Sequence, residues 1–132
     1  MEKRKLRVLV ADDDHDLVLS LTTLLRAEGH DAFGVHHGGD VVDTVAEFAP
    51  DALLLDIGMP KMSGYDVART LRERYGSARP VLIAITGRAG FADRQQARAA
   101  GFEHHVAKPY EPHSLLRLIG ELSGAAPGHD AR

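Results

Sequence analysis

The chain of 132 residues contains no cysteine and no tryptophan. The absence of cysteine excludes disulfide bonds, zinc sites with thiolate ligands and cysteine catalysis. The three tyrosines are too scattered for a base-stacking platform, and the formal net charge of -3 gives no reason to expect nucleic-acid binding. Because no apolar run is long enough for a signal peptide or a membrane span, we expect a cytoplasmic protein without membrane contact.

The length fits one domain, and along the chain segments with the pattern of strands alternate with segments of helical spacing. Uniformly apolar or short extended segments predict strands at residues 6–11, 31–35, 52–55, 81–85 and 104–107. Helical spacing follows each of them, and the helix at residues 91–100 has a poor apolar stripe. A βα unit repeated five times predicts an α/β fold with a parallel sheet covered on both faces. The predicted domain spans residues 6–123. We expect residues 124–132 to form a disordered tail or the start of a linker.

The third predicted strand ends in a carboxylate. Leu53, Leu54 and Leu55 form an apolar run without polar alternation, which is typical of a central parallel strand. Asp56 follows, and Gly58 then forces a loop. Chemistry in open α/β sheets lies just outside the carboxyl ends of the strands, so this strand presents Asp56 at the functional edge.

Each of the other four predicted strands also has a polar residue at its carboxyl end. The full set is Asp12, Asp13, His36, Asp56, Thr86 and Lys108. Three converging carboxylates cannot all stay ionised without a cation, and a hard divalent ion such as Mg²⁺ prefers oxygen ligands. Together with a hydroxyl and an ammonium group they predict a phosphoryl site, with Asp56 as the nucleophile.

Four motifs carry a resemblance to a known family. They are residues 8–13 (VLVADD), residues 54–60 (LLDIGMP) with Ser63-Gly64, residues 85–87 (ITG), and Lys108-Pro109. In this order and at these separations they resemble the receiver domains of two-component response regulators, the CheY-like superfamily, over residues 7–122. The resemblance implies a flavodoxin-like (βα)5 doubly wound sheet with strand order 2-1-3-4-5.

The resemblance also implies roles for individual residues. Asp56 would accept a phosphoryl group from a phosphohistidine of a histidine kinase or a histidine phosphotransfer protein. The ligands implied for Mg²⁺ or Mn²⁺ are Asp13, Asp56, the backbone carbonyl of Gly58, and Asp12 through a water. Thr86 and Lys108 would contact the phosphoryl oxygens, and the Lys108-Pro109 peptide bond would be cis.

A switch is implied as well, in which a phosphoryl group draws in Thr86 and shifts the helix at residues 91–100. The family usually has Tyr or Phe three residues before the lysine, where this chain has His105. Histidine could move inward in the same way, or His105 could be a partly exposed strand residue. The fourth helix, fifth strand and fifth helix would contact a downstream protein or a second copy. Arg94 and Arg98 would join that surface or remain solvated.

Other functions fit less well. A haloacid-dehalogenase-type phosphohydrolase needs an aspartate two positions after the nucleophile, where this chain has Gly58. A flavodoxin-like FMN binder would need a phosphate loop after the first strand, and the acid cluster would repel the cofactor. The intact set of Asp12, Asp13, Asp56, Thr86 and Lys108 argues against a degenerate receiver used for docking alone. The domain is either a stand-alone regulator or a piece of a longer chain.

The positions of the eight histidines in the sequence do not predict a metal site formed by histidine. The adjacent pairs His36-His37 and His104-His105 lie on or near strands, so the side chains of each pair should point to opposite faces. We interpret these histidines as surface residues.

Overall fold

The computed structural model describes residues 4–77 and 79–124. Its five strands are β1 (Arg7–Ala11), β2 (Asp31–Val35), β3 (Ala52–Asp56), β4 (Val81–Thr86) and β5 (His104–Ala107). Its helices are α1 (His15–Ala27), a 3-10 turn η1 (Gly38–Asp40), α2 (Val41–Phe48), α3 (Gly64–Tyr75), α4 (Phe91–Ala100) and α5 (Pro112–Gly124). Apart from Gly124, which ends α5, the predicted tail lies outside the described residues.

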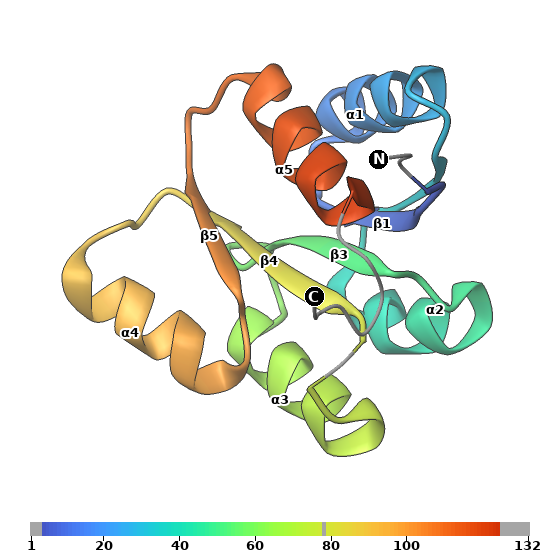
Figure 1. Cartoon of the computed structure of the whole chain (residues 1–132). Helices are drawn as coiled ribbons and strands as arrows, with labels where there is room; N and C mark the ends of the chain where they lie inside the picture. Colours follow the sequence, from blue (N-terminus) through green and yellow to red (C-terminus); the bar gives the residue numbers. More distant parts are fainter. Residues whose placement is uncertain (1–3, 78, 125–132) are drawn as a thin grey trace.

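The strands form one parallel sheet in the order β2-β1-β3-β4-β5, which confirms the predicted α/β fold and strand order (Figure 1). The register aligns the carboxyl ends of the central strands. Ala11 pairs with Leu55, and Asp56 pairs with Ile85. All chemistry placed at the ends of these strands therefore meets along one edge of the sheet.

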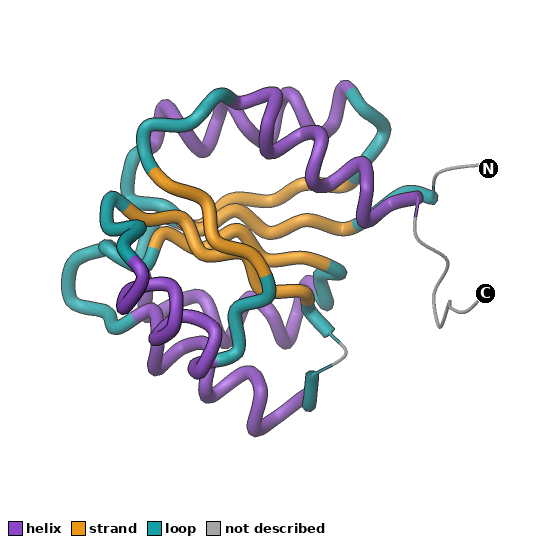
Figure 2. Tube along the Cα trace, turned by 60° about the vertical axis from the view of Figure 1, so that its left-hand side comes forward, coloured by secondary structure: helices purple, strands orange, loops and turns teal. Residues whose placement is uncertain are grey.

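Helices cover both faces of the sheet, as Figure 2 shows. The residues of β3 alternate between two cores, and each of its five residues is buried. Leu53 and Leu55 pack with α2, α3 and α4, whereas Leu54 packs with α1 and α5. Burial on both faces is the reason that the strand reads as an unbroken apolar run.

The helices on these two faces differ in how firmly they pack. In α4, Ala97 and Ala100 are the buried residues, while Phe91 at its first turn is 79% exposed. The sequence predicted this weak apolar stripe. The buried residues of α4 are therefore small side chains, which is typical of an element that shifts at low cost.

Among the residues that the structure describes, none of the helices combines the length and the apolar character that a membrane crossing requires.

Candidate functional site

The predicted site residues come together at the carboxyl edge of the sheet. Asp12 follows β1, Asp56 ends β3, Thr86 ends β4, and Lys108 follows β5. Asp12, Asp56 and Thr86 are each no more than 5% exposed. The sheet thus places Asp12, Asp56 and Thr86 on or directly after buried strand ends.

Lys108 links the two buried carboxylates. Its Nζ lies 3.0 Å from Asp56 Oδ2, to which it donates a hydrogen bond, and 3.4 Å from Asp12 Oδ2. The lysine side chain is one-third exposed, so its ammonium group stands between the buried acids and solvent. This places one positive charge where an anion approaching Asp56 would arrive.

Backbone amides hold the other oxygen of each buried carboxylate. The Gly58 amide donates to Asp56 Oδ1 over 2.9 Å, and the Asp14 amide donates to Asp12 Oδ1 over 2.9 Å. Asp14 in turn caps α1, because its side chain accepts a hydrogen bond from the Leu17 amide. The loops after β1 and β3 therefore orient the carboxylates by local turns.

The loop after β3 is fixed where it enters α3, because Gly64 lies close against Ile57. A Cβ at Gly64 would lie 2.7 Å from the backbone Cα of Ile57, so a larger residue there would displace the chain. Ser63 then caps α3 by accepting a hydrogen bond from the Asp66 amide. Glycine at position 64 lets the loop fold back beside Asp56.

Burial dominates the electrostatics of Asp12. It raises the pKa of this carboxyl, and the charge of Asp56 raises it further, against the opposing effects of the Asp14 amide and Lys108. Burial lowers the pKa of Lys108, but its hydrogen bond and charge interaction with Asp56, together with the charge of Asp12, outweigh burial and raise it overall. The lysine stays cationic, whereas the metal-free fold resists ionisation of Asp12.

The acid cluster fits a divalent cation. Asp12, Asp13 and Asp56 each offer a ligand oxygen, and these atoms lie within 4.8 Å of one another. Asp12 Oδ2 is buried and accepts no hydrogen bond from the described residues. Three clustered carboxylates form the donor set that Mg²⁺ or Mn²⁺ prefers, and these three residues could hold such an ion.

Two backbone amides donate hydrogen bonds to Thr86. Its hydroxyl accepts a hydrogen bond from the Arg88 amide over 3.0 Å, and its carbonyl accepts one from the Lys108 amide over 2.8 Å. The peptide bond after Lys108 is cis, as the resemblance implied. Thr86 therefore connects the β4–α4 loop directly to the segment that carries the lysine.

His105 lies on β5, opposite Ala84, and is partly exposed. Its Nε2 is buried without a hydrogen-bond partner in residues 4–77 and 79–124. Burial and the charge of Arg94 lower its pKa, against a smaller effect of Asp93. It lines a cavity of about 250 Å³ between α4 and β5 together with Arg94 and Arg98.

Two features of the site's rim were not predicted. The imidazole rings of His15 and His36 stack at a centroid distance of 3.7 Å, and His36 Nδ1 lies 3.4 Å from the Asp12 carbonyl oxygen. Both histidines follow the ends of neighbouring strands β1 and β2, which was the available signal. Tyr110, two residues after Lys108, has a buried hydroxyl, and no sequence pattern indicated that.

Residues 8–120 match the family described as response regulator receiver domain. The DNA-binding response regulator MtrA of Mycolicibacterium smegmatis is 34% identical over 119 residues, which cover 90% of this chain and 51% of that protein. The response regulator MprA of Mycobacterium avium is 35% identical over 127 residues, which cover 96% of this chain and 55% of that protein. The chain therefore spans about half the length of the curated relatives it matches.

Solved receiver structures share the fold. A CheY-like receiver domain protein from Methanospirillum hungatei has a TM-score of 0.81 and 24% identity, covering 90% of this chain and 94% of that one. A receiver domain from Bermanella marisrubri has a TM-score of 0.76 and 30% identity, covering 88% and 96%. The non-phosphorylated HemR receiver domain of Leptospira biflexa has a TM-score of 0.85 and 20% identity, covering 96% and 100%.

Proposed function

Because this chain belongs to the response regulator receiver domain family, we propose that it accepts a phosphoryl group on Asp56 from a phosphohistidine of a histidine kinase or a histidine phosphotransfer protein. In this step an Asp56 carboxylate oxygen attacks phosphorus. The P–N bond of the donor breaks, and its electron pair returns to the donor imidazole. The product is an acyl phosphate on the end of β3.

One observation supports this proposal above all others. Asp56 is 5% exposed at the end of a buried strand, accepts a hydrogen bond from Lys108 Nζ, and shares a 4.8 Å cluster with Asp12 and Asp13. Rigid strand ends keep the nucleophile and its neighbours in one geometry, so little reorganisation is needed when the donor arrives.

The proposal extends to the metal ligands. In the proposal Asp13, Asp56 and the Gly58 carbonyl hold Mg²⁺ or Mn²⁺, and Asp12 acts through a water. When bound, the ion supplies positive charge that offsets the acidic cluster and the phosphoryl oxygens. Lys108 adds a second positive charge beside Asp56, and the Thr86 hydroxyl donates its proton to a phosphoryl oxygen.

The proposal includes a conformational switch that depends on the hydrogen bond between the Arg88 amide and the Thr86 hydroxyl. Movement of this hydroxyl toward Asp56 would break the hydrogen bond from the Arg88 amide and release the loop that precedes α4. His105 would then respond, because its Nε2 has no partner within the described chain and the cavity beside it has room for a different ring position. Helix α4 would be the element that shifts, since so few of its residues are buried.

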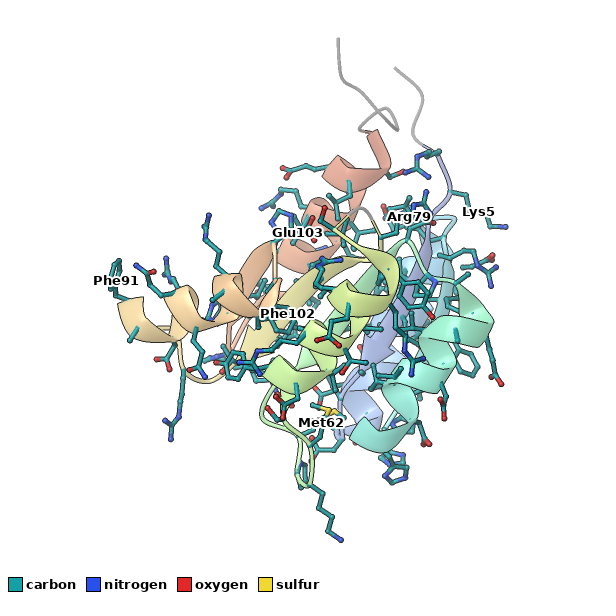
Figure 3. The ribbon with its side chains drawn as sticks, turned by 90° about the horizontal axis from the view of Figure 1, so that it is seen from below. Lys5, Met62, Arg79, Phe91, Phe102 and Glu103 are labelled. Carbon is teal, nitrogen blue, oxygen red and sulfur yellow. The ribbon has the colours of Figure 1, made fainter. Side chains whose placement is uncertain are left out.

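The surface formed by α4, β5 and α5 is the proposed contact for a downstream protein or a second copy. Phe91 projects away from the free end of α4, whereas Phe102 and Glu103 lie toward α3 (Figure 3). Arg94 and Arg98 also stand on α4, where they would recognise an acidic partner. Neither nucleic acid nor a membrane is a proposed partner of this domain, which we place in the cytoplasm.

We do not propose a turnover enzyme. A phosphohydrolase of the haloacid-dehalogenase type would use an acid/base aspartate two residues after the nucleophile, and this chain has Gly58 there. Without such a group, water is not activated at Asp56 by a second carboxylate at that position.

Intact mass after incubation with acetyl phosphate tests the proposal. We expect a gain of one phosphoryl group that requires Mg²⁺, is lost in Asp56→Asn, and is kept in Asp66→Asn, which changes an exposed aspartate on α3. The absence of any adduct in the presence of Mg²⁺ would contradict phosphoacceptor function. Steady release of phosphate without a lasting adduct would instead support the hydrolase.

A further inference from the structure

The loop between β2 and α2 (residues 36–40) lies against the loop between β3 and α3 (residues 57–63), and a glycine makes this contact possible. A Cβ at Gly38 would lie 2.5 Å from Met62 Cγ, and closer still to Met62 Cβ and Sδ. The Met62 side chain therefore packs directly on the Gly38 backbone. In Figure 3 this side chain lies between the loop that leads into α3 and the amino end of α2.

Packing fixes the path of the β3–α3 loop. Met59 is 3% exposed in the core beneath α2 and α3, and Met62 packs against the same core. Between them, Lys61 has a φ of +60°, which residues other than glycine adopt rarely and chiefly where the surrounding structure imposes it. The seats of the two methionines therefore hold this segment in a conformation that it would not choose by itself.

The β3–α3 loop carries a ligand of the proposed metal site. The Gly58 amide donates a hydrogen bond to Asp56 Oδ1, and in the proposed function the Gly58 carbonyl binds the ion. Three residues separate Gly58 from Met62, and one of them is Pro60, whose ring fixes φ. Because this segment is short and stiff, we expect a displacement of Met62 to reach the Gly58 carbonyl.

The β2–α2 loop also contacts the segment that follows β1, where Asp12 and Asp13 stand. His36 Nδ1 lies 3.4 Å from the Asp12 carbonyl oxygen, and the His36 ring stacks on His15 at the start of α1. The β2–α2 loop carries none of the proposed ligands, yet it touches both segments that carry them.

We propose that the β2–α2 loop sets the spacing of the metal ligands, with Gly38 and Met62 as positioning residues. Gly38 leaves the space in which Met62 sits, and Met62 keeps the β3–α3 loop where the Gly58 carbonyl can reach an ion held by the aspartates. The inference rests on the proposed function, in which that carbonyl is a ligand. Both residues act through the position of the loop, without touching the metal or the phosphoryl group.

Gly38→Ala tests this contact, because Met62 Cβ is bonded to the main chain. A new rotamer would move Cγ and Sδ away from the added methyl group but would leave Cβ in place, so the backbone of one loop must shift. Loss of groups that orient metal ligands typically weakens metal binding by about tenfold or more, and we expect a rise of that order in the Mg²⁺ dissociation constant. Gly39→Ala is the matched control, since a Cβ in that neighbouring position meets nothing within 4 Å.

NMR titration with MgCl₂ measures both the affinity and the loop. In metal-free Gly38→Ala the amide signals of the β3–α3 loop should move, whereas in Gly39→Ala they should stay in place. Circular dichroism establishes that each variant is at least about nine-tenths folded, because unfolding then changes the apparent dissociation constant by only about a tenth. A tenfold change therefore reports on the site and not on stability.

A compensating substitution identifies the cause as steric. Met62→Gly removes the atoms that Gly38→Ala would overlap, so the double variant should bind Mg²⁺ more tightly than Gly38→Ala alone. If Gly38→Ala does not fold, Met62→Ala takes its place and should weaken Mg²⁺ binding, because the side chain that seats on Gly38 is shortened. Its control is Leu118→Ala, which shortens a partly buried side chain of α5 in the core on the other face of the sheet.

The outcomes separate the two proposals. A wild type that binds no Mg²⁺ contradicts the proposed function. A wild type that binds Mg²⁺, together with a Gly38→Ala variant that binds it equally well, overturns the role of the Gly38–Met62 contact alone. Equal weakening in Gly38→Ala and Gly39→Ala overturns it too, as does wild-type affinity in Met62→Ala. Support requires weaker binding in Gly38→Ala, wild-type affinity in Gly39→Ala and recovery in the double variant.

Discussion

Asp12 is 2% exposed, the lowest exposure of the described acidic side chains. Burial and the neighbouring Asp56 raise its pKa in the folded state, despite the Asp14 amide and Lys108. An aspartate with a raised pKa binds its proton more tightly in the folded chain than in the unfolded chain. Its ionisation therefore lowers stability as the pH rises from 3.8 through the folded value, and this cost persists at neutral pH.

Asp12→Asn is therefore expected to stabilise the metal-free protein at pH 7. The neutral amide removes the buried charge, and we expect a rise in melting temperature of about 2 to 6 °C. The gain should shrink as the pH falls toward 3.8, because Asp12 in the wild type is then protonated too. Thermal unfolding in EDTA across this range measures it. A gain that stays constant with pH would contradict the electrostatic cause.

At the residue scale the sequence predicted which side chains gather at the carboxyl edge of the sheet, but not the detailed contacts between them. Asp12, Asp56, Thr86 and Lys108 could be predicted because parallel strand ends always meet at one edge. The stacked rings of His15 and His36 and the buried hydroxyl of Tyr110 depend on side-chain directions after folding. Such contacts leave no periodic pattern in the chain.

At the scale of whole elements, one arginine ties α3 to the turn between α4 and β5. The Arg72 guanidinium donates to the carbonyl of Gly101 over 3.0 Å, to those of Gly76 and Pro80 over 3.1 Å each, and to the Glu103 carboxylate over 2.8 Å. Its side chain is 15% exposed. This network fixes the carboxyl end of α4, so displacement of that helix is easiest at its amino end.

Gly101 makes this contact possible. Its φ of +115° lies in the left-handed region, and a Cβ there would come within 2.6 Å of Arg72 Cγ. Glycine satisfies both demands at once, because it accepts positive φ and leaves space for the arginine stem.

Arg72→Met is predicted to lower the free energy of unfolding by about 2 to 3 kcal/mol, since four acceptors lose a charged donor. Arg69→Met on the same helix is the control. Its partner is Asp66, both side chains are exposed, and such pairs contribute at most about 1 kcal/mol. Urea unfolding of both variants measures the difference. Equal losses in the two would contradict the network's importance.

The elements themselves were largely predictable, for different physical reasons. Strands β3 and β4 are covered on both faces, so burial imposes a continuous apolar run that is hard to mistake. Helix α4 was predicted at residues 91–100 from its spacing and from Gly101, although its stripe is weak. The contacts of Arg72 with Gly101 and Glu103 join residues 29 and 31 positions apart, and no local pattern could indicate them.

At the scale of the whole molecule, the hydrophobic cores on the two faces of the sheet hold in place the charged groups at its carboxyl edge. The cores on the two faces of the sheet hold β1 and β3 from both sides, and these strands present the acidic cluster. The unfolded chain has no such cluster, because Asp13 and Asp56 are then separated by a flexible segment. Any ion held by the cluster therefore binds the folded state and stabilises the whole domain.

Mg²⁺ is accordingly predicted to raise the free energy of unfolding, by about 2.7 kcal/mol at a concentration 100 times its dissociation constant. Asp13→Asn should abolish most of this gain. Because Asp13 is exposed, the same substitution should change the metal-free stability by no more than about 0.5 kcal/mol. Urea unfolding over a MgCl₂ series, with ionic strength held constant by KCl, separates specific binding from screening. If wild type and Asp13→Asn gained equally, the stabilisation would come from salt and not from an ion at the strand ends. If only the wild type gained, the carboxylates would act together as one binding site that exists in the folded protein alone.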